Sequence, residues 1–374
     1  MLKGGKNCLH SDATTKWHKH YQGFQMTTPA GKTLSIGMDQ VASGSTDALL
    51  EAFNNCIEEL SSTLSDDSPD EVTVANLIST IKYTMSDQGP INPSFNKQLQ
   101  DIRAKCLSKE HDNWESLPEK VKEDMVDMGN FFCKMHILVN FATEADKALK
   151  IFESHVINDG NNPHTFDSCS ESGSVRLIRT ACKALTKHGS DKSGVASYWN
   201  SFLSTKERVN KLVTFRGNRF NIVFYDAAAV FYHLSDIEEF LTSYPDPNKL
   251  LQSVHFDCKQ NVFQAGVKAL AITDKLITGP MWSCIEAADS ILDLNEALHK
   301  LQQSLEKFSL DASTLLQGQE TFFDDNSVHK DTLFESIFSD DSDDEQLNFM
   351  TQMALELILK SFSILLDRQA KDQL

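Results

Sequence analysis

The stretch Asn7–Lys16, NCLHSDATTK, decides the fold because it forms a short run of strand-like residues that carries an aspartate near its end. Two further runs follow it, Tyr21–Thr28 (YQGFQMTT) and Thr33–Met38 (TLSIGM), and the turn PAGK at residues 29–32 joins them. Short runs of this kind, joined by a turn that contains proline and glycine, are typical of antiparallel neighbours. The chain is therefore predicted to open with three antiparallel strands.

A helix is predicted after the third strand. Thr46 or Asp47 can cap it, and large apolar residues recur on one stripe up to Leu64. Beyond an acidic loop, the run Val72–Tyr83 fits either a helix or a helix that leads into a fourth strand. In the second case, the helical crossover would place the fourth strand parallel to the first. Three antiparallel strands, a helix and a parallel strand form the opening of a ribonuclease-H-like fold.

A second aspartate, Asp87, ends this region within Ser79–Asn96, STIKYTMSDQGPINPSFN. Carboxylates where neighbouring strands end are typical ligands of hard cations such as Mg²⁺ or Mn²⁺. Two such strands side by side would bring Asp12 and Asp87 to one metal pair, as two-metal phosphoryl transfer requires. The competing interpretation is that each aspartate is a turn residue or a helix cap.

From Asn92 onward, nearly every segment has helical spacing. The predicted helices are Ser94–Leu107, Glu119–Glu153, Ser174–His188, Gly194–Lys206, Asn218–Ser243, Lys259–Ile277, Met281–Phe308 and Asp344–Lys371. The fold class is therefore predicted to be mixed and helix-dominated. The predicted domains are a partial α/β core over residues 1–92, an all-helical domain over 93–338, and an acidic linker with a C-terminal helix over 339–374.

The composition of the 374 residues, 40% hydrophobic and 24% charged, is typical of a globular protein. No apolar run approaches the roughly 18 residues that span a bilayer, and the N-terminus lacks the apolar segment of a signal peptide, so we expect an intracellular protein with no membrane partner. The eight cysteines are scattered, which favours buried thiols over disulfides or a zinc site. The P-loop, G-x-S-x-G and H-E-x-x-H motifs are absent, which excludes hydrolases of those types.

The formal net charge of −18 argues against a polyanionic partner, but the charge is unevenly distributed. Residues 176–219 contain ten cations and two acids, whereas residues 320–345 contain ten acids and one lysine. Four of the cations recur at helical spacing, namely Arg176, Arg179, Lys183 and Lys187. They would form a cationic stripe on one helix, which suits a phosphate backbone. The alternative is a solvated face, or a segment that pairs with the acidic one.

Two further groups have motif-like spacing. Phe215–Tyr232, FRGNRFNIVFYDAAAVFY, places Arg216 and Arg219 ahead of an aromatic helix, an arrangement that predicts phosphate contacts while the rings pack or stack on a base. In FFCKMHILVNFA, residues 131–142, Cys133 and His136 share one helix face. Zinc would need two more ligands, so this pair is interpreted as packed core residues and no zinc site is predicted.

Taken in order, the stretches HSDATTKWHKHYQGFQM, TMSDQGPINPSFNKQL, FFCKMHILVNFA and TFRGNRFNIVFYDAAAVFYHL resemble the hAT superfamily of cut-and-paste DNA transposases. The resemblance implies that Asp12 and Asp87 are the first two acids of a DDE triad that binds Mg²⁺ or Mn²⁺. It implies that Cys133 and His136 are the C-x-x-H pair that opens an all-helical insertion domain. It also implies DNA as the partner and the nucleus as the location.

The chain departs from the family pattern in three places. It begins almost at the first strand, where the family carries a zinc-finger domain, and the third acid, a glutamate, is unassigned. Phe220 also stands where the family has a tryptophan. Because two aspartates cannot hold two metal ions for in-line displacement, we expect a truncated or domesticated, nucleic-acid-associated product rather than a competent transposase. If it is active, it would be a Mg²⁺-dependent nuclease.

A helical protein-interaction scaffold without a nucleic-acid role is the alternative. The net charge and the acidic segment favour it. The last helix also has apolar residues on one face over Gln346–Asp367, through which the chain could form a homo-oligomer. In the competing interpretation, the same face packs against the helical domain.

Overall fold

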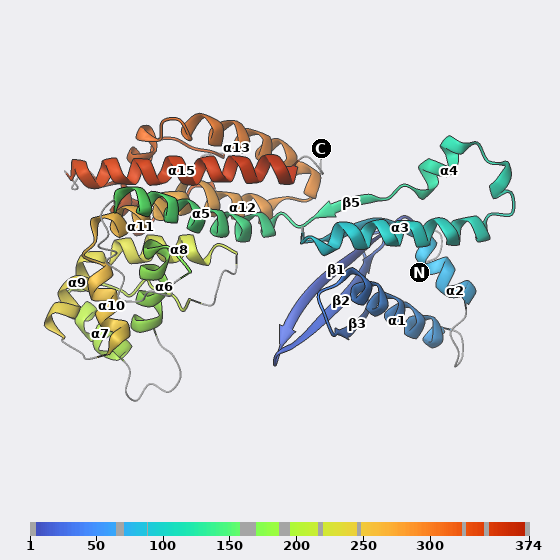
Figure 1. Cartoon of the computed structure of the whole chain (residues 1–374), viewed down its shortest axis with the longest axis horizontal. Coiled ribbons are helices and arrows are strands. Elements are labelled where there is room, and N and C mark those ends of the chain that lie inside the picture. Colours follow the sequence, from blue (N-terminus) through green and yellow to red (C-terminus); the bar gives the residue numbers. More distant parts are fainter. Residues whose placement is uncertain are drawn as a thin grey trace. The chain divides into compact units, whose positions relative to one another are not determined.

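The architecture is that of a computed structural model, shown in Figure 1. The structure describes residues 5–64, 71–87, 89–157, 170–186, 195–215, 220–244, 248–323, 327–339 and 344–370. They form two compact units, of which the first ends at Cys133 and the second begins at Lys134. The described part of the first unit combines a mixed sheet with helices, and that of the second is built from helices. The prediction of a mixed, helix-dominated fold is confirmed.

The sheet of the first unit has five strands in the order β3-β2-β1-β4-β5. The strands are β1 (Asn7–Lys16), β2 (Lys19–Thr27), β3 (Thr33–Val41), β4 (Ile81–Ser86) and β5 (Gly129–Phe132). β1, β2 and β3 pair antiparallel, whereas β4 is parallel to both of its neighbours, β1 and β5. The three antiparallel strands are therefore as predicted, and residues 72–83 follow the second interpretation, a helix that leads into a parallel strand.

Strand β5 shows that the prediction of one continuous helix over Glu119–Glu153 was wrong. This region contains helix α4 (Glu119–Val126), then β5, then helix α5 (Met135–Val156). β5 pairs with β4, and Gly129 permits close contact with Tyr83, because a Cβ there would lie 2.7 Å from the Tyr83 ring. Pairing with the sheet overrides the helical spacing of the surrounding residues. The first unit consequently extends past the boundary that was expected at residue 92.

Helices α1 (Thr46–Leu64) and α3 (Ile91–Glu110) cover one face of the sheet, and α2 (Glu71–Ser79) packs on α3. Three phenylalanines form the centre of this core. Phe24 of β2 meets Phe53 of α1 edge to face at 5.4 Å between ring centroids, and Phe53 meets Phe95 of α3 at 5.9 Å. Because side chains alternate along a strand, the buried Leu9 of β1 faces these helices and Asp12 lies on the other face.

The second unit packs its helices around one apolar core. Besides α5, its described helices are α6 (Gly173–Leu185), α7 (Val195–Thr205), α8 (Ile222–Tyr232), α9 (Leu234–Ser243), α10 (Lys249–Asp257), α11 (Asn261–Thr273), α12 (Gly279–Ala287), α13 (Leu294–Phe308), α14 (Thr332–Phe338) and α15 (Glu345–Ala370). A π-helical turn, Asp274–Thr278, joins α11 to α12. Two predicted helices, Asn218–Ser243 and Met281–Phe308, are each divided in two, and α10 and α14 were not predicted.

Helix α15 packs against α5, α11 and α13, so its apolar face is internal. Along that face, Met350, Ala354, Ile358 and Leu366 are buried. The competing interpretation, in which this face packs within the helical unit, is therefore the correct one. A homo-oligomer stays a prediction, but this face is not available to form it. α15 is the one helix of the described chain that is long and apolar enough to cross a membrane, and half of its apolar window is buried inside the protein.

Candidate functional site

The sheet brings Asp12 and Asp87 to equivalent positions on neighbouring strands. The last pair of the parallel β1–β4 ladder is His10 with Met85, and two further residues lead to Asp12 on one strand and to Asp87 after the other. Asp12 is exposed and pairs across the sheet with Gly23 of β2. The register thus aligns Asp12 and Asp87 along neighbouring strands, but it does not place their carboxylates on the same face of the sheet.

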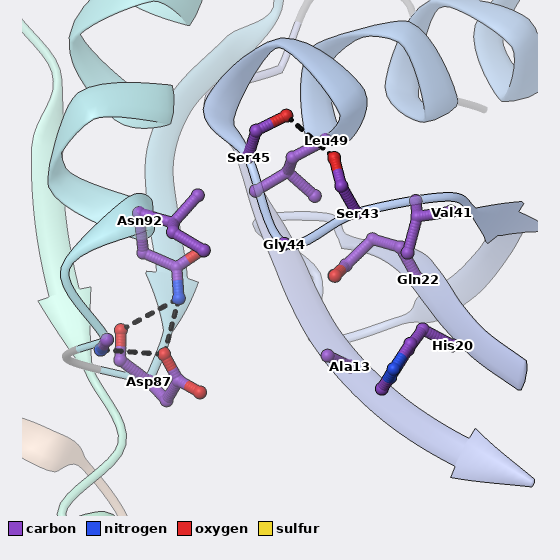
Figure 2. A pocket seen from close by; sticks show the side chains of 12 residues that line it. Ala13, His20, Gln22, Val41, Ser43, Gly44, Ser45, Leu49, Asp87 and Asn92 are labelled. Atoms are coloured by element: carbon purple, nitrogen blue, oxygen red, sulfur yellow. Dashed lines mark hydrogen bonds between the residues drawn. The ribbon is translucent and has the colours of Figure 1, made fainter. Parts of the chain in front are cut away.

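The carboxylate of Asp87 is engaged by the start of α3, as Figure 2 shows. The Gly89 amide donates to Asp87 Oδ1 at 2.8 Å, and the Asn92 side-chain amide donates to the same oxygen and to the Asp87 carbonyl oxygen at 3.2 Å. A negative charge at this end of a helix is also favoured by the helix dipole. Asp87 therefore has the geometry of a turn residue, and within the described chain no hydrogen bond reaches its Oδ2 atom.

The described side chains do not by themselves fit a resident metal ion. No group of three His, Cys, Asp or Glu residues among them could hold one. Asp12 lies on the sheet face away from α1 and α3, whereas Asp87 lines a pocket on the face that these helices cover. Mg²⁺ takes about six oxygen ligands in a nearly regular octahedron, and a single turn carboxylate supplies few of them. Binding of Mg²⁺ or Mn²⁺ stays a prediction.

The pocket beside Asp87 has a volume of about 240 Å³ and was not anticipated from the sequence. Figure 2 shows that strand side chains, the loop between β3 and α1, and the start of α3 converge on it. In the loop, Ser43 and Ser45 share a hydrogen bond of 3.1 Å, and Ser45 caps α1 by accepting from the Ala48 amide at 3.2 Å. The available signal was the run SGSTD at residues 43–47, of which only Thr46 or Asp47 was predicted to cap the helix, whereas Ser45 does so.

The predicted cationic stripe on α6 is not a solvent-facing edge. The guanidinium of Arg176 is buried, with 2% of the side chain exposed, and donates to both carboxylate oxygens of Asp257 at 2.8 and 2.7 Å. This contradicts a phosphate-binding role for Arg176, because α6 is packed between α8, α10 and α11. Arg179 is half-buried and pairs with Glu171, whereas Lys183 is exposed.

Lys187, Arg216 and Arg219 lie outside the described residues, so their predicted roles stay predictions. Other cations of the basic segment are paired with acids inside the helical unit. Lys206 donates to Asp236 at 3.1 Å, and Arg208 lies 2.6 Å from the same carboxylate. The paired cations of the basic segment, residues 176–219, thus have acids outside residues 320–345 as their described partners.

Cys133 and His136 lie on either side of the boundary between the units. The backbone amide of Cys133 donates to the Ser86 carbonyl oxygen at 2.8 Å just after β5. His136 lies in the first turn of α5, and its ring meets Phe220 edge to face at 6.1 Å. The single helix face expected for the pair is absent, because α5 begins only at Met135.

Two buried aspartates of the helical unit were missed by sequence reasoning. Burial raises the pKa of Asp226 to about 7, although hydrogen bonds from the Val213 amide and the Cys182 thiol partly oppose this rise. Burial likewise raises the pKa of Asp274 to about 6, where the Asn221 side chain donates to it at 2.8 Å. The signal for Asp226 was a lone acid inside the apolar run FYDAAAVFY.

No protein-family model matches this chain, and neither the curated proteins nor the solved structures gave a match. The relation to hAT transposases therefore stays a resemblance carried by the sequence motifs.

Proposed function

We propose that this chain is a nucleic-acid-associated protein derived from an hAT-type transposase, and that it serves binding rather than strand transfer. The observation that carries the proposal is the parallel pairing of β1 with β4. Three antiparallel strands, the helices α1 and α2 and the parallel strand β4 open the chain as the resemblance implies, and the helical unit begins after α3, α4 and β5. The same pairing puts Asp12 and Asp87 at equivalent strand positions.

The restriction to binding rests on the state of the two acids. Asp87 holds the turn into α3 through its Oδ1 atom, and no third acid joins it within the described chain. A carboxylate engaged in this way is available to a metal ion only through its other oxygen. Strand transfer through two metal ions needs several carboxylates free at one point.

Phosphate contacts are assigned to Lys183, which is exposed on α6. From the predicted set they are also assigned to Lys187, Arg216 and Arg219, which lie outside the described residues. The logarithm of the binding constant falls linearly with the logarithm of the salt concentration. Each cation that neutralises a phosphate steepens this slope by up to about 0.9 on duplex DNA and about 0.7 on single strands. The contribution of these residues is therefore measurable one by one.

The test measures DNA binding of the full chain as a function of salt. A Lys187/Arg216/Arg219 triple alanine variant is expected to lower the log–log salt slope by at most about three units. The matched control is Lys147/Lys300/Lys360 to alanine, which changes the net charge equally at exposed sites elsewhere in the helical unit. Equal slopes for the two triple variants, or no binding by the parent at micromolar protein and low salt, would show that the proposal is wrong.

A protein-interaction scaffold is the second candidate, and the internal pairing of the described basic residues favours it. Arg176 and Arg179, which were predicted to contact phosphates, pair instead with Asp257 and Glu171. This candidate predicts no salt-dependent DNA binding. It also predicts a mass above that of the monomer in light scattering, alone or with a protein partner.

A further inference from the structure

Gln22 is a buried polar side chain whose amide lacks good partners in the described structure. It lies on β2 facing the helices, with 7% of the residue exposed, and Figure 2 shows its amide directed into the pocket beside Asp87. Its Nε2 atom donates to the carbonyl oxygen of adjacent Gly23 at 3.5 Å, the long limit for a hydrogen bond, and no described group donates to its Oε1. The Gln22 amide, held only by this long hydrogen bond, can therefore offer a donor and an acceptor to a ligand in the pocket.

The pocket walls suit a flat, apolar ring. Leu49 of α1, Ile91 of α3 and Val41 of β3 contribute hydrocarbon, and Gln22 adds one amide with a donor and an acceptor. The volume of about 240 Å³ is below that of sites for drug-sized molecules, which start at roughly 300 Å³. A ligand of the size of a nucleobase matches this space.

The charge of the pocket argues against a phosphate inside it. No lysine or arginine is among its lining residues. The positive end of α3 is already faced by the Asp87 carboxylate, whose Oδ2 atom accepts no described hydrogen bond. An anion would be repelled there, whereas a neutral ligand with amino hydrogens would gain an acceptor.

We propose that this pocket binds adenine, presented either as an unpaired base of a single-stranded nucleic acid or as a free nucleoside. A glutamine amide pairs with adenine through two bonds, one from the N6 amino group to the amide oxygen and one from the amide nitrogen to N7. The Asp87 Oδ2 atom offers a further acceptor at the pocket edge. The single-stranded source rests on the proposed function, whereas the nucleoside source is independent of it.

The first experiment titrates the full chain with adenosine, inosine and uridine by calorimetry. Adenosine is expected to bind at least tenfold more tightly than inosine, in which an oxygen replaces the N6 amino group. Gln22→Leu is expected to weaken adenosine binding about ten- to hundredfold, as for loss of a bidentate base contact. Gln25→Leu, on the same strand but exposed on the other face, is the control and should bind as the parent does.

A second variant guards against a folding defect in Gln22→Leu. Ala13→Phe places a ring at the exposed end of the pocket without altering the buried core, and it should abolish adenosine binding with an unchanged circular dichroism spectrum. Equal binding of adenosine and inosine, no adenosine binding at millimolar concentration, or binding that Gln22→Leu leaves unchanged would each overturn the proposal.

The second experiment separates the two sources with oligo(dA) and oligo(dT). A preference for oligo(dA) that Gln22→Leu removes supports an unpaired base as the ligand. Binding of adenosine that depends on Gln22, with no binding of either oligonucleotide, supports the nucleoside pocket while the nucleic-acid function fails. Binding of both oligonucleotides equally, with no effect of Gln22→Leu, overturns the pocket proposal and leaves the nucleic-acid function standing.

Discussion

The charged residues singled out from the sequence are placed differently in the two units of this protein. In the sheet unit, aromatic rings such as Phe24 and Phe53 form the core, and Asp12 and Asp87 lie on an exposed face or at a turn. In the helical unit, Arg176 and Asp226 are inside the protein. The comparison teaches that the spacing of charged residues along a strand indicates their exposure better than the spacing of charged residues along a helix does.

The largest effect is expected from breaking the buried ion pair of the helical unit. Arg176→Ala leaves the Asp257 carboxylate buried without its guanidinium, which should lower the free energy of unfolding by about 3–5 kcal/mol. Urea unfolding followed by circular dichroism measures it. A double variant, Arg176→Met with Asp257→Leu, should recover most of the loss because both charges are removed.

The control for this prediction is Arg179→Ala on the same helix, which removes a half-buried pair with Glu171, a residue just before the start of α6. Its cost should stay within about 1 kcal/mol. Equal losses for Arg176→Ala and Arg179→Ala would mean that burial of the Arg176–Asp257 pair has no energetic consequence, and the buried position of charge in the helical unit would then lose its significance.

An intermediate effect is expected from Asp226→Asn, and it depends on pH. Burial raises the pKa of Asp226 from 3.8 to about 7, so the folded state holds a proton that the unfolded state releases. The stability gained from this proton is full below about pH 4 and is lost as the pH rises towards 7. At pH 8 the variant should therefore be more stable than the parent by about 1–3 kcal/mol, the usual cost of a poorly paired buried group.

Unfolding midpoints at pH 5, 6.5 and 8 test this sign. The advantage of Asp226→Asn should be smallest at pH 5 and grow at pH 6.5 and pH 8. Asp274, whose pKa burial raises to about 6, has the same sign, so part of the pH dependence should remain in the variant. A variant that is less stable than the parent at pH 8 would contradict the buried position of Asp226.

The smallest effect concerns the two acids of the sheet unit. Asp87→Ala removes the acceptor for Gly89 and Asn92, and it should cost about 1 kcal/mol, as for loss of a helix cap. Asp12→Ala changes an exposed side chain and should stay within about 0.5 kcal/mol. Thermal unfolding of both variants makes the comparison, and equal losses would show that Asp87 has no structural role beyond that of Asp12.

Much of the sheet could be predicted because its signals are local. The alternation in residues 7–38 and the turn before Thr33 identify three antiparallel strands without knowledge of the rest of the chain. β5 could not be recognised in this way, because GNFF precedes an apolar helix and only pairing with β4 makes it a strand. The end of the sheet unit was missed for the same reason.

The candidate site was less predictable than the fold. The spacing of Arg176 and Arg179 indicates one helix face, but it does not tell which neighbour covers that face, and Asp257 is distant in the sequence. The pocket depends on Gln22, Leu49 and Asp87, which come from separate elements. Contacts of this kind depend on tertiary packing, which a local pattern does not contain.

The π-helical turn between α11 and α12 sets the direction in which the side chains of α12 project from the helix axis. Gly279 donates its amide to the carbonyl oxygen of Asp274, five residues earlier, and a Cβ on Gly279 would lie 2.7 Å from that oxygen. Each α-helical residue turns the chain by about 100°, so deletion of a single residue in this turn would swing the side chains of α12 around the axis by that angle. One surplus residue thereby fixes which side of α12 meets the core.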